Sequence, residues 1–317
     1  MSEPAAATAD PAAAAGGGRP RPRPGRRAAT ILGLVMLAGA VAFVVAAGDR
    51  LAGARAALAS PDPAAIAAIL AAVAVNLLLT GAFFRLLYAR HARIGMLEMQ
   101  AVMAAASLLN YLPLRPGLAG RVAYHRAVHG VPVRSSVLVM VQALGLSGLI
   151  AAAVAMAAWA SSAGHLPLEA GLGGLAALAG LAVIIRRLAI AARPGLAEAI
   201  GPWPAAALLR LAEVGCVALR TWAAFALVGQ PITAAAATAL AAAAVIVTMV
   251  PLSSNGLGLR EWATGLLAPA LAGVPMETAI AADLLARAAE LLVVGAAGGV
   301  SLAWLGRRGT APAAGVS

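Results

Sequence analysis

Charged residues, cysteine and aromatic residues are all scarce in this sequence, and each scarcity excludes a class of protein. Only 11% of the 317 residues are charged and 62% are hydrophobic, whereas a soluble domain has about 25% charged and about 45–50% apolar residues. A core surrounded by water cannot hide this much apolar surface, so lipid must surround most of the chain. The single cysteine, Cys216, excludes a disulfide framework and a multi-cysteine metal site. The four histidines show no ligand motif, so we expect neither a metal nor another cofactor.

Lysine is absent, and all 23 basic residues are arginine, which give a net charge of +11. Aromatic residues make up 4% of the chain, and the arginines flank apolar runs. Membrane topology therefore explains this charge better than a nucleic-acid partner does.

Apolar runs long enough to cross a membrane follow one another along the chain. A helix needs about 20 residues to cross about 30 Å of hydrocarbon, and the runs near that length are 28–48, 64–88, 135–159, 170–185, 205–228, 232–251 and 280–305. A signal peptide is the alternative for 28–48, but its length favours an uncleaved helix. Two shorter runs, 96–112 and 260–272, lie beside Pro/Gly-rich segments. Short, interrupted apolar segments point to a transporter binding site.

The arginines set the expected orientation. If 260–272 crosses and 96–112 does not, 17 arginines lie inside, two outside, and four within or at the ends of spans. This asymmetry predicts about eight transmembrane helices in the inner membrane, with both termini cytoplasmic. The expected fold is an all-α polytopic helix bundle with one or two re-entrant segments. The expected domains are a disordered Arg/Pro/Ala-rich tail at 1–27, a transmembrane domain at 28–306 and a short cytoplasmic tail at 307–317.

The two Pro/Gly segments repeat one pattern. The first reads NYLPLRPGLAGR over 110–121 with GVP at 130–132, and the second reads MVPLSSNGLGLRE over 249–261 with GVP at 273–275. Proline would end the preceding helix, and glycine permits tight turns. The start of a helix within the membrane has free N–H groups and the positive end of the helix dipole, so it suits an anion. Arg121 and Arg260 would add full charges that bind a phosphate. In the alternative interpretation, the loops only connect helices and the arginines mark the inner interface.

These segments resemble the lysylphosphatidylglycerol synthase transmembrane-domain family, also called flippase-like integral membrane proteins, over roughly 30–305. The residues that match its motifs are Pro113, Gly117 and Arg121 in the first segment, Pro251, Ser253, Gly256, Gly258 and Glu261 in the second, and Arg287 in the last helix. The resemblance implies a membrane protein that moves or handles a lipid or a lipid-linked sugar. It also implies a flippase-like unit without the aminoacyl-transferase domain of the best-known members.

Charged residues also interrupt two of the apolar runs. Glu213 lies between Arg210 and Arg220 on one arc of 205–228. In 280–305, Asp283, Arg287 and Glu290 form one stripe. Because charge within a membrane is costly, we expect Arg220 to pair with Glu290. Pairing all three charged residues of one helix with those of the other would require the two helices to shift along each other by about two turns. The stripes are either a polar route for a headgroup, with Glu290 or Asp283 taking up protons, or a structural ion pair with Arg210 reaching the interface.

The leading function is translocation of an anionic phospholipid or lipid-linked sugar between leaflets, without enzymatic activity. A lipid-modifying transferase is the first alternative, although the sequence has no paired carboxylates in a loop, no metal cluster and no donor-binding domain. A scaffold for a separate lipid synthase is the second. The expected ligand is a membrane lipid, and the sequence does not define an oligomeric state.

Overall fold

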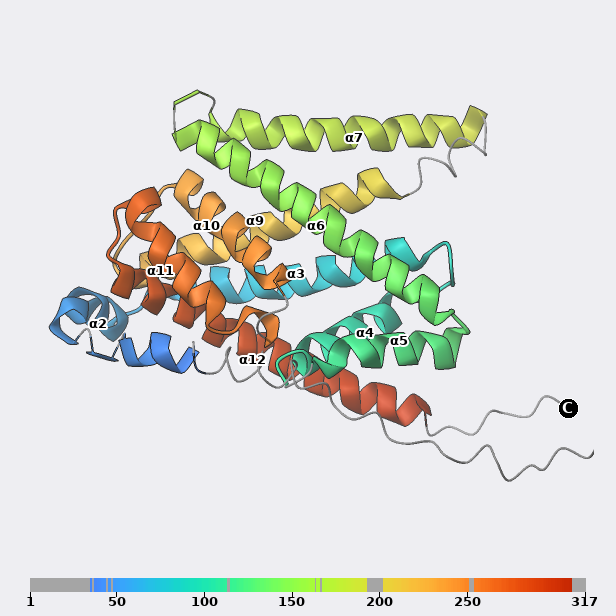
Figure 1. Cartoon of the computed structure of the whole chain (residues 1–317), viewed down its shortest axis with the longest axis horizontal. Helices are drawn as coiled ribbons and strands as arrows, with labels where there is room; N and C mark the ends of the chain where they lie inside the picture. Colours follow the sequence, from blue (N-terminus) through green and yellow to red (C-terminus); the bar gives the residue numbers. More distant parts are fainter. Residues whose placement is uncertain are drawn as a thin grey trace, which may run out of the picture.

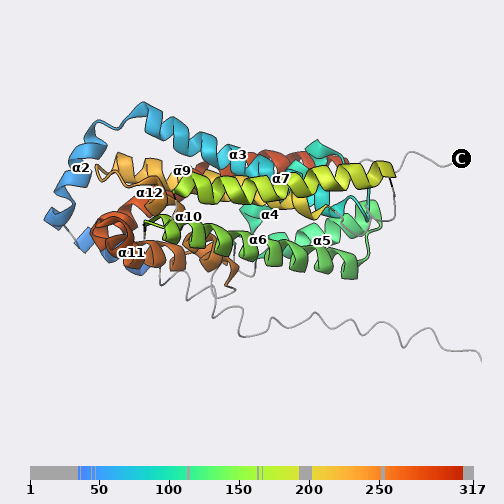
Figure 2. The same ribbon diagram turned by 90° about the horizontal axis from the view of Figure 1, so that it is seen from above.

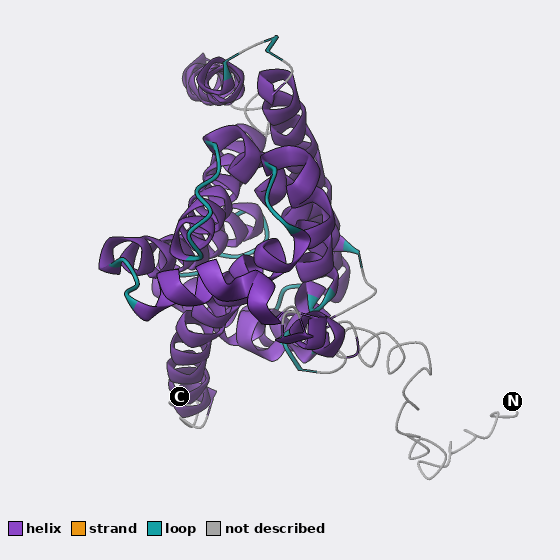
Figure 3. Ribbon diagram, turned by 90° about the vertical axis from the view of Figure 1, so that its left-hand side faces the viewer, coloured by secondary structure: helices purple, strands orange, loops and turns teal. Residues whose placement is uncertain are grey.

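The computed structural model describes residues 35, 37–43, 45–46, 48–112, 115–162, 164–165, 167–192, 202–250 and 254–309. The regular structure of these residues is helical throughout (Figure 3), which confirms the expected all-α fold. The principal helices are α2 (Ala52–Ala59), α3 (Pro63–Tyr88), α4 (Met96–Leu109), α5 (Pro116–His129), α6 (Val133–Ser162), α7 (Leu168–Ala192), α9 (Trp203–Leu227), α10 (Ala234–Met249), α11 (Leu259–Ala272) and α12 (Met276–Gly309). The tail expected at 1–27, most of the tail expected at 307–317 and part of the first run, 28–48, lie outside the described residues.

Three of the described helices are long and apolar enough to cross a membrane. They are α3, α6 and residues Met276–Arg307 of α12, with mean hydropathies of 2.3, 2.2 and 1.7. Helix α9 has 25 residues but carries Arg210, Glu213 and Arg220 within its length. The positions of α3, α6, α9 and α12 agree with the apolar runs expected at 64–88, 135–159, 205–228 and 280–305.

Two helical hairpins lie between the long helices. Helices α4 and α5 have 14 residues each, α10 has 16 and α11 has 14, so each arm is only about 21–24 Å long at 1.5 Å per residue. In Figure 1, the α4–α5 hairpin enters from one end of the bundle and the α10–α11 hairpin from the opposite end. The expectation that 96–112 does not cross agrees with this arrangement. The runs 232–251 and 260–272, which we counted among about eight spans, form α10 and α11, the two arms of a second hairpin.

Left-handed backbone turns the chain at both hairpin tips. Arg115 has a φ of 47° before α5, and Asn255, Gly256 and Gly258 have φ values of 50°, 72° and 76° before α11. Glycine adopts these angles without the steric penalty that a side chain brings. Helix α11 begins after Gly258 without a side-chain cap. Pro113, Pro251 and Ser253 lie outside the described residues.

The fold repeats one unit of a long helix, a hairpin and a second long helix. The first unit is α3–α6 and the second is α9–α12. The packing is reciprocal, because α3 packs on α9, α4 packs on α12 and α10 packs on α6. In Figures 1 and 2, α3 and α9 run in opposite directions, as do α6 and α12. The internal repeat expected from the two Pro/Gly segments is therefore a repeat of inverted orientation.

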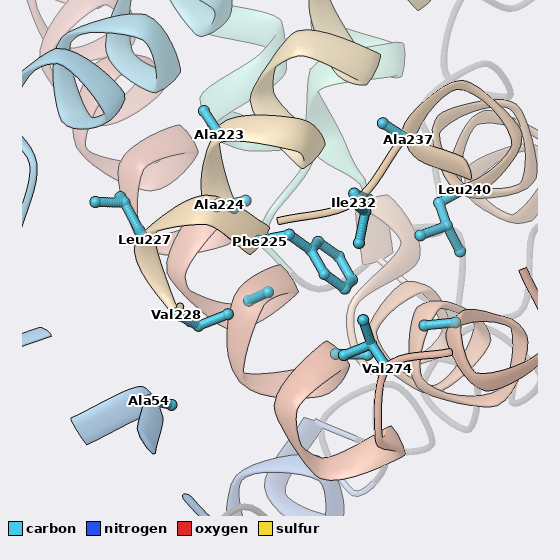
Figure 4. Close-up of a cluster of buried hydrophobic side chains, with 14 of the residues drawn as sticks. Ala54, Ala223, Ala224, Phe225, Leu227, Val228, Ile232, Ala237, Leu240 and Val274 are labelled. Carbon is cyan, nitrogen blue, oxygen red and sulfur yellow. The ribbon is translucent and has the colours of Figure 1, made fainter. Parts of the chain in front are cut away.

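A buried apolar cluster lies at the base of each hairpin. Around the α10–α11 hairpin, Phe225, Ile232 and Val274 point toward one another (Figure 4). Around the α4–α5 hairpin, the cluster contains Phe83, Tyr88 and Met99, together with Val131 and Val139. These two clusters fix the bases of the hairpins and leave their tips to meet at the centre of the bundle.

The contact between α4 and α12 depends on a glycine. A Cβ atom added at Gly298 would lie 2.5 Å from Leu108 Cβ and 2.9 Å from the carbonyl oxygen of Ala104, whereas one added at Gly299 meets nothing within 4 Å. We predict that Gly298→Ala destabilises the protein by about 1–3 kcal/mol through overpacking. We predict that Gly299→Ala, the matched control, is neutral or stabilises it by up to about 1 kcal/mol. Thermal unfolding in detergent checks this pair, and equal melting temperatures would contradict the close packing of α4 on α12.

Candidate functional site

A cavity of about 640 Å³ lies where the two hairpin tips meet. The first tip contributes Asn110, Tyr111 and Arg115, and the second contributes Asn255 and Arg260. The two Pro/Gly segments thus come together, as their repetition predicts. The hairpin arms and the long helices α3, α6, α9 and α12 supply the remaining walls, with Phe84, Met140, Leu144, Val214, Val217 and Val294 among the apolar residues.

Glu290 is the centre of an ion network on one side of the cavity. Its carboxylate accepts hydrogen bonds from Arg220 Nη1 at 2.7 Å, Arg260 Nη1 at 3.0 Å and Tyr111 Oη at 2.5 Å. Arg287 Nη1 lies 3.8 Å from the same carboxylate. The expected pairing of Arg220 with Glu290 is confirmed. Tyr111 also lines the cavity.

Two further carboxylates complete the network behind Glu290. Arg260 Nε donates to Asp283 at 2.9 Å, and Arg287 Nε donates to Glu261 at 2.9 Å. Glu261 is fully buried, and Arg287 also donates to the carbonyl oxygen of Asn255 at 3.3 Å. The network therefore balances three guanidiniums against three carboxylates and joins α9, α11 and α12 to the first hairpin tip.

Arg210 and Glu213 form a separate ion pair within α9. The guanidinium of Arg210 lies 3.7 Å from the ring centroid of Phe83, and both charged side chains line the cavity. Arg210 therefore belongs to the cavity, whereas one interpretation of the sequence had it reaching the membrane interface. The pairing within α9 also explains why no full ladder forms between α9 and α12.

Arg121 differs from the other arginines of the cavity. Its side chain is 5% exposed, its guanidinium lies 4.1 Å from the ring centroid of Phe84, and Nη1 contacts Met103 Sδ at 3.4 Å. Among the residues that the structure describes, no carboxylate forms an ion pair with it. The cavity and its supporting network contain six arginines, Arg115, Arg121, Arg210, Arg220, Arg260 and Arg287, and four carboxylates, Glu213, Glu261, Asp283 and Glu290. This excess of positive charge suits an anionic ligand.

The glycines of the two motifs shape the backbone around the cavity. A Cβ atom on Gly117 would lie 2.0 Å from the carbonyl oxygen of Ala106, so this glycine lets α5 pack closely on α4. Gly256 and Gly258 adopt left-handed angles in the second tip. These three residues therefore position the tips, and among the motif side chains Arg121 is the one that faces the cavity without a carboxylate partner in the described part of the chain.

Sequence reasoning missed several polar residues of the cavity. Asn76 and Thr80 of α3 both line it, and Ser147 of α6 does so as well. Asn76 and Thr80 are four residues apart within an apolar run, a spacing that places them on one helix face and was a usable signal. In the described residues, His, Cys, Asp and Glu side chains form no group of three or more that could hold a metal ion.

Comparison with known families gives one informative match. The model of a family described as lysylphosphatidylglycerol synthase TM region matches residues 30–298. No curated protein and no solved structure matches the chain.

The buried pair of Glu261 and Arg287 allows a test of the network. We predict that Glu261→Gln destabilises the protein by about 3–5 kcal/mol, because it leaves Arg287 without its buried counter-ion. The double variant Glu261→Gln/Arg287→Gln should recover part of this loss, whereas Glu169→Gln, an exposed control in α7, should change stability by less than about 0.5 kcal/mol. The measurement is thermal unfolding of each purified variant. Additive losses in the double variant would show that the two charges are not coupled.

Proposed function

The chain belongs to the lysylphosphatidylglycerol synthase TM-region family, and we propose that it moves an anionic phospholipid or a lipid-linked sugar phosphate between leaflets by admitting the headgroup to the central cavity. The family makes this a membrane protein tied to lipid handling. The proposal adds that the lipid is anionic and that the protein moves it without modifying it.

The observation that carries the proposal is Arg121, a buried guanidinium that faces the cavity without a carboxylate partner among the described residues. An isolated charge in the membrane interior is costly, and such residues usually mark a substrate pathway. A phosphate beside Arg121 would supply the missing counter-charge. The planar guanidinium offers paired donors that match phosphate oxygens. Arg260 contributes less than the sequence suggested, because Asp283 and Glu290 already bind it.

The cavity also has the size and lining that a lipid headgroup requires. Its volume of about 640 Å³ lies within the range of about 300–1,000 Å³ typical of small-molecule sites. Asn76, Thr80 and Asn110 provide neutral hydrogen-bonding groups for the headgroup. The apolar walls suit the first carbons of the acyl chains.

The inverted repeat supplies a route to both leaflets. In transporters with inverted repeats, the substrate site lies at the interface between the repeats, and rocking of one repeat against the other exposes it to each side in turn. The arginine distribution favours an orientation with both termini cytoplasmic in the inner membrane. In that orientation the α4–α5 hairpin opens to the cytoplasm and the α10–α11 hairpin opens to the opposite side.

The geometry gives less support to the alternatives. A carboxylate is one group that could act as the acid or base of a transferase, but the two cavity carboxylates, Glu213 and Glu290, are each bound by arginine. The same contacts support a counter-ion role for Glu290 more than the role of proton acceptor in the other interpretation. A scaffold for a separate lipid synthase would present charge to its partner, whereas Arg220, Arg260 and Arg287 direct their charges inward.

A transport assay tests the role of Arg121. We predict that Arg121→Gln in proteoliposomes slows the movement of fluorescent phosphatidylglycerol between leaflets by at least about tenfold, since a charge-assisted hydrogen bond contributes about 1.5–3 kcal/mol. Arg126→Gln, which removes an exposed arginine from the same helix, should retain the wild-type rate. The rate is read from quenching of the outer-leaflet probe by dithionite.

Two outcomes would contradict the proposal. Equal rates for Arg121→Gln and Arg126→Gln would show that the phosphate does not bind beside Arg121 in this cavity. A new lipid species in the wild-type vesicles, detected by mass spectrometry after addition of an activated donor, would favour the transferase.

A further inference from the structure

A stripe of basic and titratable side chains connects the cavity to the open end of the α4–α5 hairpin. Arg121, His125 and His129 follow one another at intervals of four residues in α5, so they lie on one face of the helix, with a rise of about 6 Å between successive members. Arg121 lines the cavity. The ring centroids of His125 and His129 are 6.0 Å apart.

The outer end of this stripe reaches a carboxylate. His129 Nε2 lies 2.9 Å from Glu98 Oε1, and Tyr124 Oη donates to the same oxygen at 2.7 Å. The side chains of His129 and Glu98 are 15% and 16% exposed, so protons can reach them from outside the protein. Histidine and carboxylate side chains are the usual members of proton relays in membrane proteins.

His125, in the middle of the stripe, is fully buried. Among the described residues, neither of its ring nitrogens has a hydrogen-bond partner. Its ring packs against Tyr88 of α3 in a tilted arrangement, with centroids 4.3 Å apart, and it also lies beside Tyr124 and His129 of its own helix. The charged and titratable groups that face it are Arg121, Tyr124 and His129 of α5, Tyr88 of α3 and Glu98 of α4, while Arg134 of α6 is exposed at the start of its helix.

We propose that the central site binds a proton as its second ligand, on a ring nitrogen of His125, when a lipid phosphate occupies the cavity beside Arg121. The inference rests on the proposed function, because it needs the phosphate at that position. The proton comes from water at the open end of the hairpin, passes through the Glu98–His129 pair and adds to the neutral imidazole of His125. It returns by the same path when the lipid leaves.

The physical reason is the balance of charge around His125. In the empty site, burial and the neighbouring guanidinium of Arg121 both oppose an imidazolium. A lipid phosphate anion beside Arg121 cancels the charge of the guanidinium, so the electrostatic repulsion that opposes the protonated ring is lost. Because linkage is reciprocal, protonation of His125 must tighten the binding of the anion by the same factor.

Calorimetry tests this linkage with the full chain in nanodiscs of phosphatidylcholine and short-chain phosphatidylglycerol as the probe. Binding heats at pH 6.5 in two buffers of different ionisation enthalpy give the number of protons taken up per lipid. We predict uptake of roughly one proton by the wild type, and binding that is about tenfold tighter at pH 6 than at pH 8. We predict that His125→Gln still binds the lipid, takes up no proton and changes its affinity by less than about twofold over this range.

The control variants make failure informative. His91→Gln, at an exposed position after α3, should behave as the wild type does. His129→Gln should slow proton uptake in a stopped-flow measurement with an indicator dye and leave the total uptake unchanged, which tests the path even if His125→Gln fails to fold. Lipid binding by the wild type without proton uptake, or uptake retained in His125→Gln, would overturn the inference and leave the proposed function intact. Unchanged lipid binding by Arg121→Gln would instead overturn the proposed function.

Discussion

The compensation of buried charge in the middle of the bundle is the constraint on which this structure depends. Glu290 of α12 accepts hydrogen bonds from Arg220 of α9, Arg260 of α11 and Tyr111 at the tip of the first hairpin. Breaking a buried ion pair leaves an uncompensated charge and is strongly destabilising, so these contacts hold four segments in one arrangement. Both hairpin tips are therefore fixed against α12, and the cavity between them keeps its shape.

Against this balanced network, Arg121 is the exception. The network neutralises its own charges, so the positive potential of the cavity comes from arginines outside it. Protein structures rarely tolerate a buried charge without a partner unless a ligand supplies one. A lipid phosphate is an anion that this environment contains in abundance. The inverted repeat places the site between two hairpins that enter from opposite ends (Figure 1).

The sequence predicted the long helices and the repeat, because apolar runs and Pro/Gly motifs can be recognised from neighbouring residues alone. It also predicted the pairing of Arg220 with Glu290, because a charge within the membrane is costly and needs a partner of opposite sign. It missed α5, since the Arg- and His-rich stretch 116–129 has no apolar run to mark it. It predicted α10 and α11 as apolar helices, but their pairing into a hairpin depends on tertiary packing. One interpretation placed Arg210 at the interface, since only tertiary packing reveals that Phe83 lies next to it.

The central claim is that the cavity beside Arg121 binds a lipid phosphate. Native mass spectrometry of the protein, extracted gently from its own membrane, tests it most directly by identifying the lipids that remain bound. The account predicts one retained class of phosphate-bearing lipid in the wild type and in Arg126→Gln, and its loss in Arg121→Gln. A random sample of bulk lipid, the same in all three proteins, would contradict the account and would make these arginines markers of topology.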